Sequence, residues 1–428
     1  MTDVTSFVQA FKEATPYINN LRGKTVVVGI NSYAASTQYF ADIMQDIVLL
    51  NNIGLYLVLV FDVSQEALPE QHTVHISQAE LEVIKTAIGR TQIDIEACLS
   101  MGYPNLSISR SRMDVVSSNY VVAKSQGVIN GRDAAFLGKV RSIQLDLLRR
   151  HLLEKNIVLI KPMGYSISGI SYYIPMSELA SRLAIALKAE KLLFLTRAKG
   201  IVDKKDHVLN NLTVEEVKRQ WVVQQQHPDI VSIFPAICET LASREVKRVQ
   251  LVPFSHEGAL VAELFTRNGI GTSLSYDSFT HVRVAKNKDI PSILTLVEPL
   301  VEAGTLIKRS RRYFEAHINE FCVVVYDEVM CGCAQLKPYE GEAAELACLA
   351  VSPLAQDTGY GEQLLACIEK LAKLQGKTQL FALTTQTADW FEERGFIQVS
   401  AEQLPKERLL EYQKAKRQSK VLLKHLMK

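Results

Sequence analysis

The chain has 428 residues, of which 47% are hydrophobic and 22% charged, with 21 glycines and 13 prolines. This composition is ordinary for a globular protein, and it excludes a disordered, collagen-like or low-complexity chain. The 48 basic and 46 acidic side chains leave a formal net charge of +2. No strong overall field therefore favours nucleic acid or an anionic membrane, and we expect a small-molecule partner instead.

The N-terminal segment 1–17 has an acidic residue where a signal peptide has a basic patch, and it lacks an apolar core. No apolar run approaches the ~18 residues that a membrane helix needs. The seven cysteines are scattered and form no Cys-x-x-Cys pair, which predicts reduced thiols. We therefore expect a soluble, cytoplasmic protein.

Residues up to about 275 alternate short apolar runs with amphipathic segments, in which apolar residues recur three and four apart. Strands are expected over 25–30, 55–61, 157–160, 192–195 and 246–253, and helices over 37–50, 78–100, 142–155, 177–190 and 257–267. Strand–helix alternation of this kind predicts an α/β domain with an open, mainly parallel sheet.

The pattern changes after the polar segment 273–280, which we interpret as a linker between domains at 1–276 and 281–428. Beyond it, strands are expected over 282–285, 321–326, 330–336, 344–351 and 379–383, and helices over 289–303, 311–319, 360–374 and 387–394. A tight turn at Asp327-Glu328 predicts an antiparallel hairpin. The second domain is thus expected to be α+β with a mixed sheet.

The loop 356–362 (QDTGYGE), between a predicted strand and helix, is the clearest chemical signal. Backbone N–H groups at a helix N-terminus bind anions, and Gly359 and Gly361 would let the backbone approach a pyrophosphate. A plain structural turn is the alternative. With the later segment 390–396 (WFEERGF), this loop resembles the GNAT acetyltransferases over roughly residues 282–428. The resemblance implies acetyl-CoA as co-substrate.

The first region resembles the amino-acid kinases, close to the acetylglutamate kinases, through the segments 187–196 (LKAEKLLFLT) and 263–272 (ELFTRNGIGT). A domain of this kind ahead of a GNAT domain is the arrangement of bacterial N-acetylglutamate synthases, and the segment 345–353 (ELACLAVSP) agrees with it. The resemblance implies direct acetyl transfer to the α-amino group of L-glutamate, the first step of arginine biosynthesis. It also implies regulation by arginine and a homo-oligomer.

The first domain departs from the kinases at its phosphate-binding positions. Kinases of this family carry a Lys before a Gly-Gly pair at the end of the first strand, where this chain reads VGINS (28–32). A second glycine-rich loop is replaced by FDVS (61–64), and Asp62 would repel a γ-phosphate. Because phosphoryl transfer depends on positioning and charge neutralisation, we predict that this domain is catalytically silent.

The resemblance implies that the silent domain senses arginine. It places the effector at Tyr17, Lys191, Arg267, Gly269 and Gly271. Many relatives have an acidic residue where this chain has Asn268, and a neutral amide weakens a contact with a guanidinium. Helix capping is the alternative role of the two glycines.

Acetyl transfer to an amine requires a general base, because a protonated amine is not a nucleophile. The resemblance places the base at Glu345, acting directly or through a water, with a solvent-exposed strand edge as the alternative. Strand alternation puts Glu345 and Ala347 on one face, and Leu346 and Cys348 on the other.

The other site residues also follow from the resemblance. A backbone N–H of Cys348 or Leu349 would stabilise the oxyanion, and Thr384 or Thr385 would assist the leaving thiolate. Acetyl-CoA contacts are expected from Cys348, Leu349, Val351, Gln356, Asp357, Thr358, Gly359, Tyr360, Gly361 and Glu362. Because a dicarboxylate needs cations, glutamate contacts are expected from Lys308, Cys348, Arg417 and Ser419.

The histidines predict no metal site, since His72 and His75 have no ligand partners at suitable spacing. Cys331 and Cys333 are expected on one face of a strand, in the core. Other functions stay open: an acetylglutamate kinase, an amino-acid-sensing regulatory protein with vestigial chemistry, or an acetyltransferase for a different amine.

Overall fold

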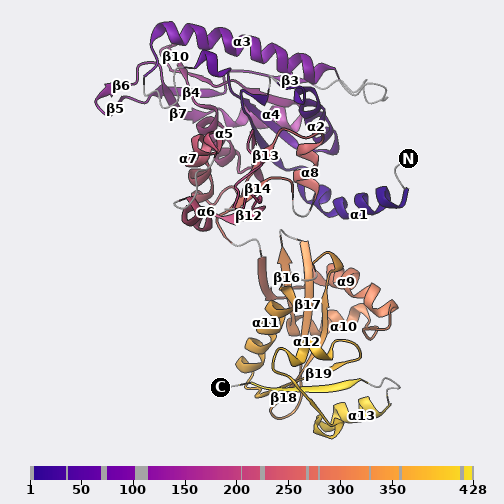
Figure 1. The fold of residues 1–428 in the computed structure, drawn as a ribbon. Coiled ribbons are helices and arrows are strands. Elements are labelled where there is room, and N and C mark those ends of the chain that lie inside the picture. The colour runs from indigo at the N-terminus through magenta and orange to yellow at the C-terminus, as the bar shows by residue number, and fades with distance from the viewer. Residues whose placement is uncertain are drawn as a thin grey trace. The chain divides into compact units, whose positions relative to one another are not determined.

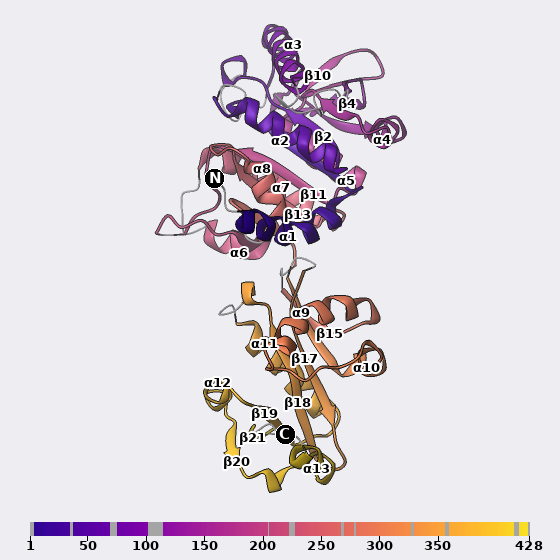
Figure 2. The ribbon, with the colours of Figure 1, turned by 90° about the vertical axis from the view of Figure 1, so that its right-hand side faces the viewer.

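The chain forms two compact units in a computed structural model, Met1–Ser278 and Phe279–Lys428 (Figures 1 and 2). The structure describes residues 4–34, 37–68, 75–101, 114–203, 205–221, 227–266, 269–277, 280–326, 329–355, 359–414 and 419–426. Within these ranges, no helix is long and apolar enough to cross a bilayer.

The main sheet of the first unit has eight strands in the order β12-β14-β13-β11-β1-β2-β8-β3. Its five central strands run parallel, as the strand–helix alternation predicts. They are β13 (Arg248–Pro253), β11 (Lys191–Thr196), β1 (Thr25–Ile30), β2 (Tyr56–Phe61) and β8 (Ile157–Ile160). These strands are buried along most of their length because helices cover both faces of the sheet.

Each face of this sheet has its own hydrophobic cluster. One face packs against α2 (Phe40–Ile53), α3 (Gln78–Ser100) and α8 (Ala259–Phe265). The other packs against α4 (Leu145–Leu153), α5 (Met176–Leu187), α6 (Val214–Trp221) and α7 (Pro228–Ala242). The N-terminal helix α1 (Val4–Leu21) packs on α8. The predicted mainly parallel α/β architecture of this region is confirmed.

The first unit also contains strands that the sequence did not predict. A four-stranded sheet has the order β10-β9-β4-β7. Its strands are β10 (Ser171–Tyr173), β9 (Met163–Tyr165), β4 (Val121–Ser125) and β7 (Gly138–Ile143). The helix expected from residue 142 begins only at Leu145, because residues 138–143 pair with β4.

The prediction of a linker over 273–280 is wrong in its first half. Residues Thr272–Ser275 form β14, which pairs antiparallel with β13 and parallel with β12 (Asn211–Thr213). All four residues of β14 are buried. Because Ser273 and Ser275 are polar, the sequence did not indicate a buried strand here. Two short strands, β5 (Val128–Ile129) and β6 (Arg132–Asp133), form a separate hairpin, and β3 (Val115–Val116) ends the main sheet.

The second unit has a mixed seven-stranded sheet, in the order β15-β16-β17-β18-β19-β21-β20. The strands are β15 (Thr280–Val284), β16 (Phe321–Tyr326), β17 (Val329–Pro338), β18 (Ala343–Val351), β19 (Gln379–Thr384), β20 (Ile397–Val399) and β21 (Lys420–His425). Strands β16 and β17 pair antiparallel, as predicted, and β18 and β19 pair parallel. The predicted turn at 327–328 lies outside the described residues.

Helices cover both faces of this second sheet. Figure 1 shows α11 (Tyr360–Leu374) on one side of the strands, with α9 (Ile290–Glu302) and α10 (Arg311–His317) on the other. Helix α12 (Ala388–Glu392) follows β19, and α13 (Lys406–Lys414) precedes β21. The predicted mixed-sheet α+β fold of this unit is therefore confirmed.

Two β-bulges reverse the side-chain alternation expected from the sequence. In β17, pairing with β16 shifts between Val324 and Val325, so Cys331 and Cys333 lie in clusters on opposite faces. In β18, Cys348 has a φ of 50°, and Leu346 and Cys348 likewise lie on opposite faces. The prediction of a shared face is wrong for both pairs, because an inserted residue breaks the period of two.

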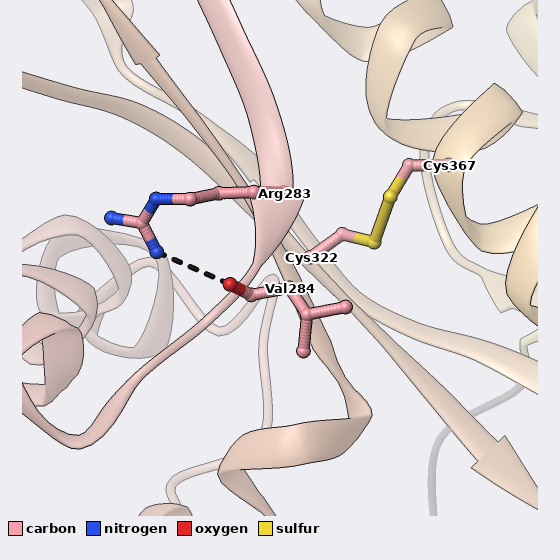
Figure 3. The surroundings of a disulfide bond; sticks show 4 residues. All are labelled: Arg283, Val284, Cys322 and Cys367. Carbon is pink, nitrogen blue, oxygen red and sulfur yellow. Dashed lines mark hydrogen bonds between the residues drawn. A yellow bond between two sulfur atoms is a disulfide. The ribbon is translucent and has the colours of Figure 1, made fainter.

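A disulfide joins Cys322 of β16 to Cys367 of α11 (Figure 3). The prediction that all seven cysteines are reduced is therefore wrong for this pair. The two residues are 45 positions apart in the sequence, and only the packing of α11 against β16 brings them together. Among the described residues, the cysteines at 98, 238, 331, 333 and 348 form no disulfide.

Candidate active site

The candidate site lies where two parallel neighbours, β18 and β19, separate. Their pairing runs from Ala343–Gln379 to Leu346–Ala382. Both strands continue past the last pair, β18 to Val351 and β19 to Thr384. The bulge at Cys348 follows directly. The backbone of β18 therefore turns away from β19 at Cys348 and Leu349, whose N–H groups are the predicted oxyanion donors.

Glu345 lies on β18 just before this separation and is 6% exposed. Its carboxylate forms a bidentate ion pair with Arg408 of α13, with Nε–Oε2 and Nη2–Oε1 distances of 2.9 and 3.1 Å. The Tyr339 hydroxyl donates a third hydrogen bond to Oε2 at 3.0 Å. The alternative of a water-exposed strand edge is wrong, because this carboxylate is buried.

The three donors leave acceptor capacity on Glu345. A carboxylate has about four acceptor positions, and Arg408 and Tyr339 fill three of them. Oε1 accepts a single hydrogen bond among the described residues. Burial and the neighbouring Glu345 charge raise the pKa of the Tyr339 hydroxyl, which therefore remains a donor. The sequence did not single out either partner of Glu345.

Cys348 lies in the same cluster as Cys333, on the face of the sheet that α9 and α10 cover. The Cys333 Sγ lies 3.8 Å from the Cys348 carbonyl oxygen. A hydrogen bond from the Cys333 thiol lowers the pKa of Cys348, and the charge of Arg309 acts in the same direction. Leu349 and Val351 pack on the opposite face, against the α11 cluster.

Helix α11 begins at Tyr360, within the predicted phosphate-binding segment 356–362. Gly359 precedes it with a φ of +77°, a conformation that favours glycine. Gln356, Asp357 and Thr358 lie outside the described residues. The described part of the loop is thus a helix N-terminus entered through a left-handed glycine.

The two GNAT-like segments meet at the first turn of this helix. A Cβ on Gly361 would lie 2.9 Å from the Trp390 ring, so the ring requires glycine here. Arg394 stacks over Trp390 at 4.1 Å and forms an ion pair with Glu362. The hydrogen bond from Arg394 lowers the pKa of Glu362. The WFEERGF segment therefore packs on the helix that follows the loop.

Thr384 ends β19, and its hydroxyl belongs to a local turn. Its Oγ1 accepts from the backbone N–H of Thr387 at 3.0 Å and lies 2.9 Å from the Thr387 Oγ1. Thr385, the alternative, is exposed. The fixed hydroxyl of Thr384 lies at the end of the strand that separates from β18.

The residues predicted to hold glutamate differ in their surroundings. Lys308 is exposed, while the next residue, Arg309, is half-buried and donates to Gln335 of β17. Ser419 is half-buried, and its carbonyl accepts from the Tyr412 hydroxyl at 2.8 Å. Arg417 lies outside the described residues.

In the first unit, the glycine turn at 269–271 wraps around a buried carboxylate, Glu263 of α8. The backbone N–H groups of Ile270 and Gly271 donate to Oε2 at 2.8 and 3.0 Å, and Gln250 donates to Oε1 at 2.7 Å. A Cβ on Gly269 would lie 2.4 Å from the Glu263 carboxylate, and one on Gly271 would lie 1.9 Å from a backbone oxygen. Local packing thus requires both glycines.

Two other residues of the predicted arginine site, Lys191 and Tyr17, lie in the same part of the unit. Lys191 is 7% exposed, and its charge lowers the pKa of Glu263, although burial raises this pKa overall. Tyr17 of α1 packs against the hydrophobic cluster that includes residues of α8. Arg267 and Asn268 lie outside the described residues.

In the first unit, side chains pack closely around the segments 28–32 and 61–64, which correspond to the phosphate-binding positions of the kinases. A Cβ on Gly29 would lie 2.7 Å from both Met176 and Phe194. Asp62 accepts from its neighbour's backbone N–H at 2.9 Å and from the Tyr173 hydroxyl at 3.3 Å. Burial raises the pKa of Asp62 to about 6. Among the described residues, no group of three or more His, Cys, Asp or Glu side chains could hold a metal ion.

The separated strands β18 and β19, the buried carboxylate of Glu345 on β18 and the glycine-initiated helix α11 define a GNAT-type acetyltransferase unit. The model of the acetyltransferase (GNAT) domain matches residues 317–398, and that of the amino acid kinase family matches residues 33–231. The fold and both matched regions agree with the two resemblances found in the sequence.

Relatives extend the similarity to nearly the whole chain. The amino-acid acetyltransferase of Actinobacillus pleuropneumoniae serotype 3 (strain JL03) is 36% identical, over 99% of each chain. That of Neisseria meningitidis serogroup B (strain ATCC BAA-335 / MC58) is 37% identical, over 98% of each. The N-acetylglutamate synthase from Neisseria gonorrhoeae, solved with coenzyme A and L-arginine, is 35% identical with a TM-score of 0.88, covering 99% of this chain and 100% of its own. The chain belongs to the family of amino-acid acetyltransferases and is an enzyme of that class.

Proposed function

We propose that this enzyme transfers the acetyl group of acetyl-CoA to the α-amino group of L-glutamate. The observation that carries the proposal is the similarity to the Neisseria gonorrhoeae synthase, which was solved with coenzyme A and L-arginine and also with coenzyme A and N-acetyl-glutamate. The buried Glu345 at the separation of β18 and β19 supports it, because acetylation of an amine needs a base at that point.

The proposed chemistry is direct attack. Glu345 accepts the amine proton through Oε1, directly or through a water, and the neutral nitrogen attacks the thioester carbonyl. A backbone N–H of Cys348 or Leu349 stabilises the oxyanion. The intermediate then collapses with cleavage of the C–S bond. The attacking nitrogen gives its second proton to the departing sulfur, to which the Thr384 hydroxyl donates a hydrogen bond. Arg408 and Tyr339 hold the Glu345 carboxylate in place throughout.

Acetyl-CoA would bind at the N-terminus of α11. The backbone N–H groups after Gly359 suit a pyrophosphate, and the Arg394–Glu362 ion pair offsets the carboxylate charge beside it. Gln356, Asp357 and Thr358, the first residues of the predicted loop, would complete this site. The glutamate carboxylates would be held by Lys308, Arg417 and Ser419.

The first unit is proposed to sense arginine rather than to transfer phosphate. Lys191 and Asp62 are enclosed in local packing, and the Lys and Gly-Gly pair of the kinases are missing. Tyr17, Lys191, Arg267 and the 269–271 turn would form the effector site, in a homo-oligomer.

Product analysis and two-substrate kinetics test this proposal. The purified protein is incubated with acetyl-CoA and each of the common amino acids, and the products are identified by mass spectrometry. N-Acetylglutamate should dominate, and initial-velocity plots should intersect, as direct attack requires. Parallel plots would indicate an acetyl-enzyme and overturn the direct attack. Absence of N-acetylglutamate would overturn the assigned substrate.

A further inference from the structure

Two thiols lie in contact beside the point where β18 turns away from β19. Cys333 of β17 and Cys348 of β18 both pack in the hydrophobic cluster under α9 and α10. The Cys333 Sγ lies 3.8 Å from the Cys348 carbonyl oxygen and within hydrogen-bond reach of the Cys348 thiol. The strand register explains this proximity, because Cys333 pairs with Ala350, two residues beyond Cys348.

The two thiols differ in accessibility and in acidity. Cys333 is fully buried, whereas Cys348 retains exposed surface. The hydrogen bond from Cys333 and the charge of Arg309 lower the pKa of the Cys348 thiol. The same hydrogen bond and burial raise the pKa of Cys333 well above its usual range, so this sulfur keeps its proton. Cys348 is therefore the nucleophilic partner, and Cys333 is a protonated thiol held against it.

The other thiols of the chain lack this arrangement. Cys331 is buried and packs on the opposite face of the sheet. Cys98 and Cys238 lie in the first unit, and burial raises the pKa of both. Oxidants react with accessible thiolates, and a neighbouring thiol converts the first product into a disulfide. Among the described cysteines, Cys348 combines exposed surface, a lowered pKa and a thiol neighbour.

We propose that Cys348 is a site of reversible oxidation by peroxides and that Cys333 is its resolving thiol. The Cys348 thiolate attacks one peroxide oxygen, which forms an S–O bond, breaks the O–O bond and releases hydroxide. The Cys333 sulfur then attacks the sulfur of the resulting sulfenic acid, and the departing hydroxyl takes the Cys333 proton and leaves as water. The two sulfurs are oxidised and the two peroxide oxygens are reduced. A dithiol reverses the modification by thiol–disulfide exchange.

This disulfide would stop acetyl transfer at the bulge. It replaces a contact between two thiols with a covalent bond, which pulls the Cys348 backbone towards β17. The N–H groups of Cys348 and Leu349 are the predicted oxyanion donors, and a displacement of about 1 Å costs roughly 100-fold in rate. The effect on turnover rests on the proposed glutamate acetylation, whereas the disulfide itself forms without substrate.

The test follows turnover and the disulfide map together. The enzyme is treated with hydrogen peroxide and assayed with acetyl-CoA and glutamate. It is then digested without reduction by a glutamate-specific protease, which cleaves between the two cysteines, and the peptides are analysed by mass spectrometry. Turnover should fall about tenfold or more, and a peptide pair joined through Cys333 and Cys348 should appear. Dithiothreitol should remove this pair and restore turnover. Enzyme treated with dithiothreitol alone gives the baseline, because the reagent can also reduce the Cys322–Cys367 disulfide.

Cys333→Ser distinguishes reversible from irreversible oxidation. Without the resolving thiol, excess peroxide should convert Cys348 to the sulfinic acid. The loss of turnover should then persist after dithiothreitol, and the Cys348 peptide should gain two oxygen atoms. Cys98→Ser is the matched control, since Cys98 is half-buried like Cys348 but has a raised pKa. This control should respond to peroxide as the wild type does.

Oxidised enzyme without the Cys333–Cys348 peptide pair would overturn the inference, and so would full turnover in enzyme that carries the pair. Recovery of Cys333→Ser by dithiothreitol to the wild-type extent would exclude Cys333 as the resolving thiol. If thermal melting shows that Cys333→Ser does not fold, the disulfide map and the recovery of the wild type decide between the same outcomes. Failure of the proposed function looks different, because the peptide pair would then form in an enzyme that does not acetylate glutamate even before treatment.

Discussion

Replacing Arg408 with Gln tests whether the second unit depends on the buried ion pair at its centre. The two side chains are 12% and 7% exposed, so the substitution leaves the Glu345 charge buried with only Tyr339 as a donor. Removing one partner of a buried pair costs about 3–5 kcal/mol, because the remaining charge loses its compensation. With a urea slope of about 2–3 kcal/mol/M, the unfolding midpoint should fall by roughly 1–2.5 M.

The control is Arg311→Gln, which breaks an exposed pair with Glu315 whose side chains are 69% and 51% exposed. An exposed pair contributes at most about 1 kcal/mol, so this midpoint should hardly move. The chain has two tryptophans, Trp221 in the first unit and Trp390 in the second. In a Trp221→Phe background, fluorescence therefore reports unfolding of the second unit. Equal midpoint shifts in the two arginine variants would mean that the buried pair stabilises the unit no more than the exposed pair does.

The remaining predictions concern the base, the first unit and the effector. Glu345→Gln should lower turnover by about 100-fold or more while acetyl-CoA binding, measured by calorimetry, is unchanged; unchanged turnover would remove Glu345 from the base role. Burial raises the pKa of Asp62 to about 6 in the folded chain, from 3.8. The unfolded chain thus loses its proton first, and stability is lost as the pH rises from about 4 to 6. Asp62→Asn should raise the free energy of unfolding by up to about 3 kcal/mol at pH 8 and leave it unchanged at pH 3. Denaturation followed at Trp221 in a Trp390→Phe background measures this free energy. Equal effects at both pH values would contradict the prediction. Arginine should bind the wild type with measurable heat, and Gly269→Ala should abolish that heat, because the new Cβ collides with Glu263; heat retained in the variant would place the effector elsewhere.

The sequence predicted the elements whose signal is local. Apolar runs located β1 and β8 at their observed bounds, and helical periodicity did the same for α3 and α11. The order of the 356–362 and 390–396 motifs in the sequence indicated that both belong to one unit. It did not predict that Gly361 packs directly against Trp390. Short or polar strands such as β14 have no such local signal. Pairing with β13 stabilises β14, whereas its own composition does not favour a strand.

The site itself was only partly predictable. The resemblance placed Glu345 on the correct strand, but Arg408 is 63 residues further along the chain and is brought to it by α13. The face occupied by Cys348 was mistaken, because a bulge leaves no clear pattern in the sequence. The pairing of Cys322 with Cys367 likewise depends on the contact between a strand and a helix, which residue spacing does not encode.

In the proposed reaction, the second unit acetylates L-glutamate with Glu345 as the base. Release of the coenzyme A thiol, followed at neutral pH with acetyl-CoA and either L-glutamate or no amino acid, tests it most directly. Thiol release should be rapid, should depend on glutamate and should be lost in Glu345→Gln. Thiol release at the same rate with and without glutamate would contradict it.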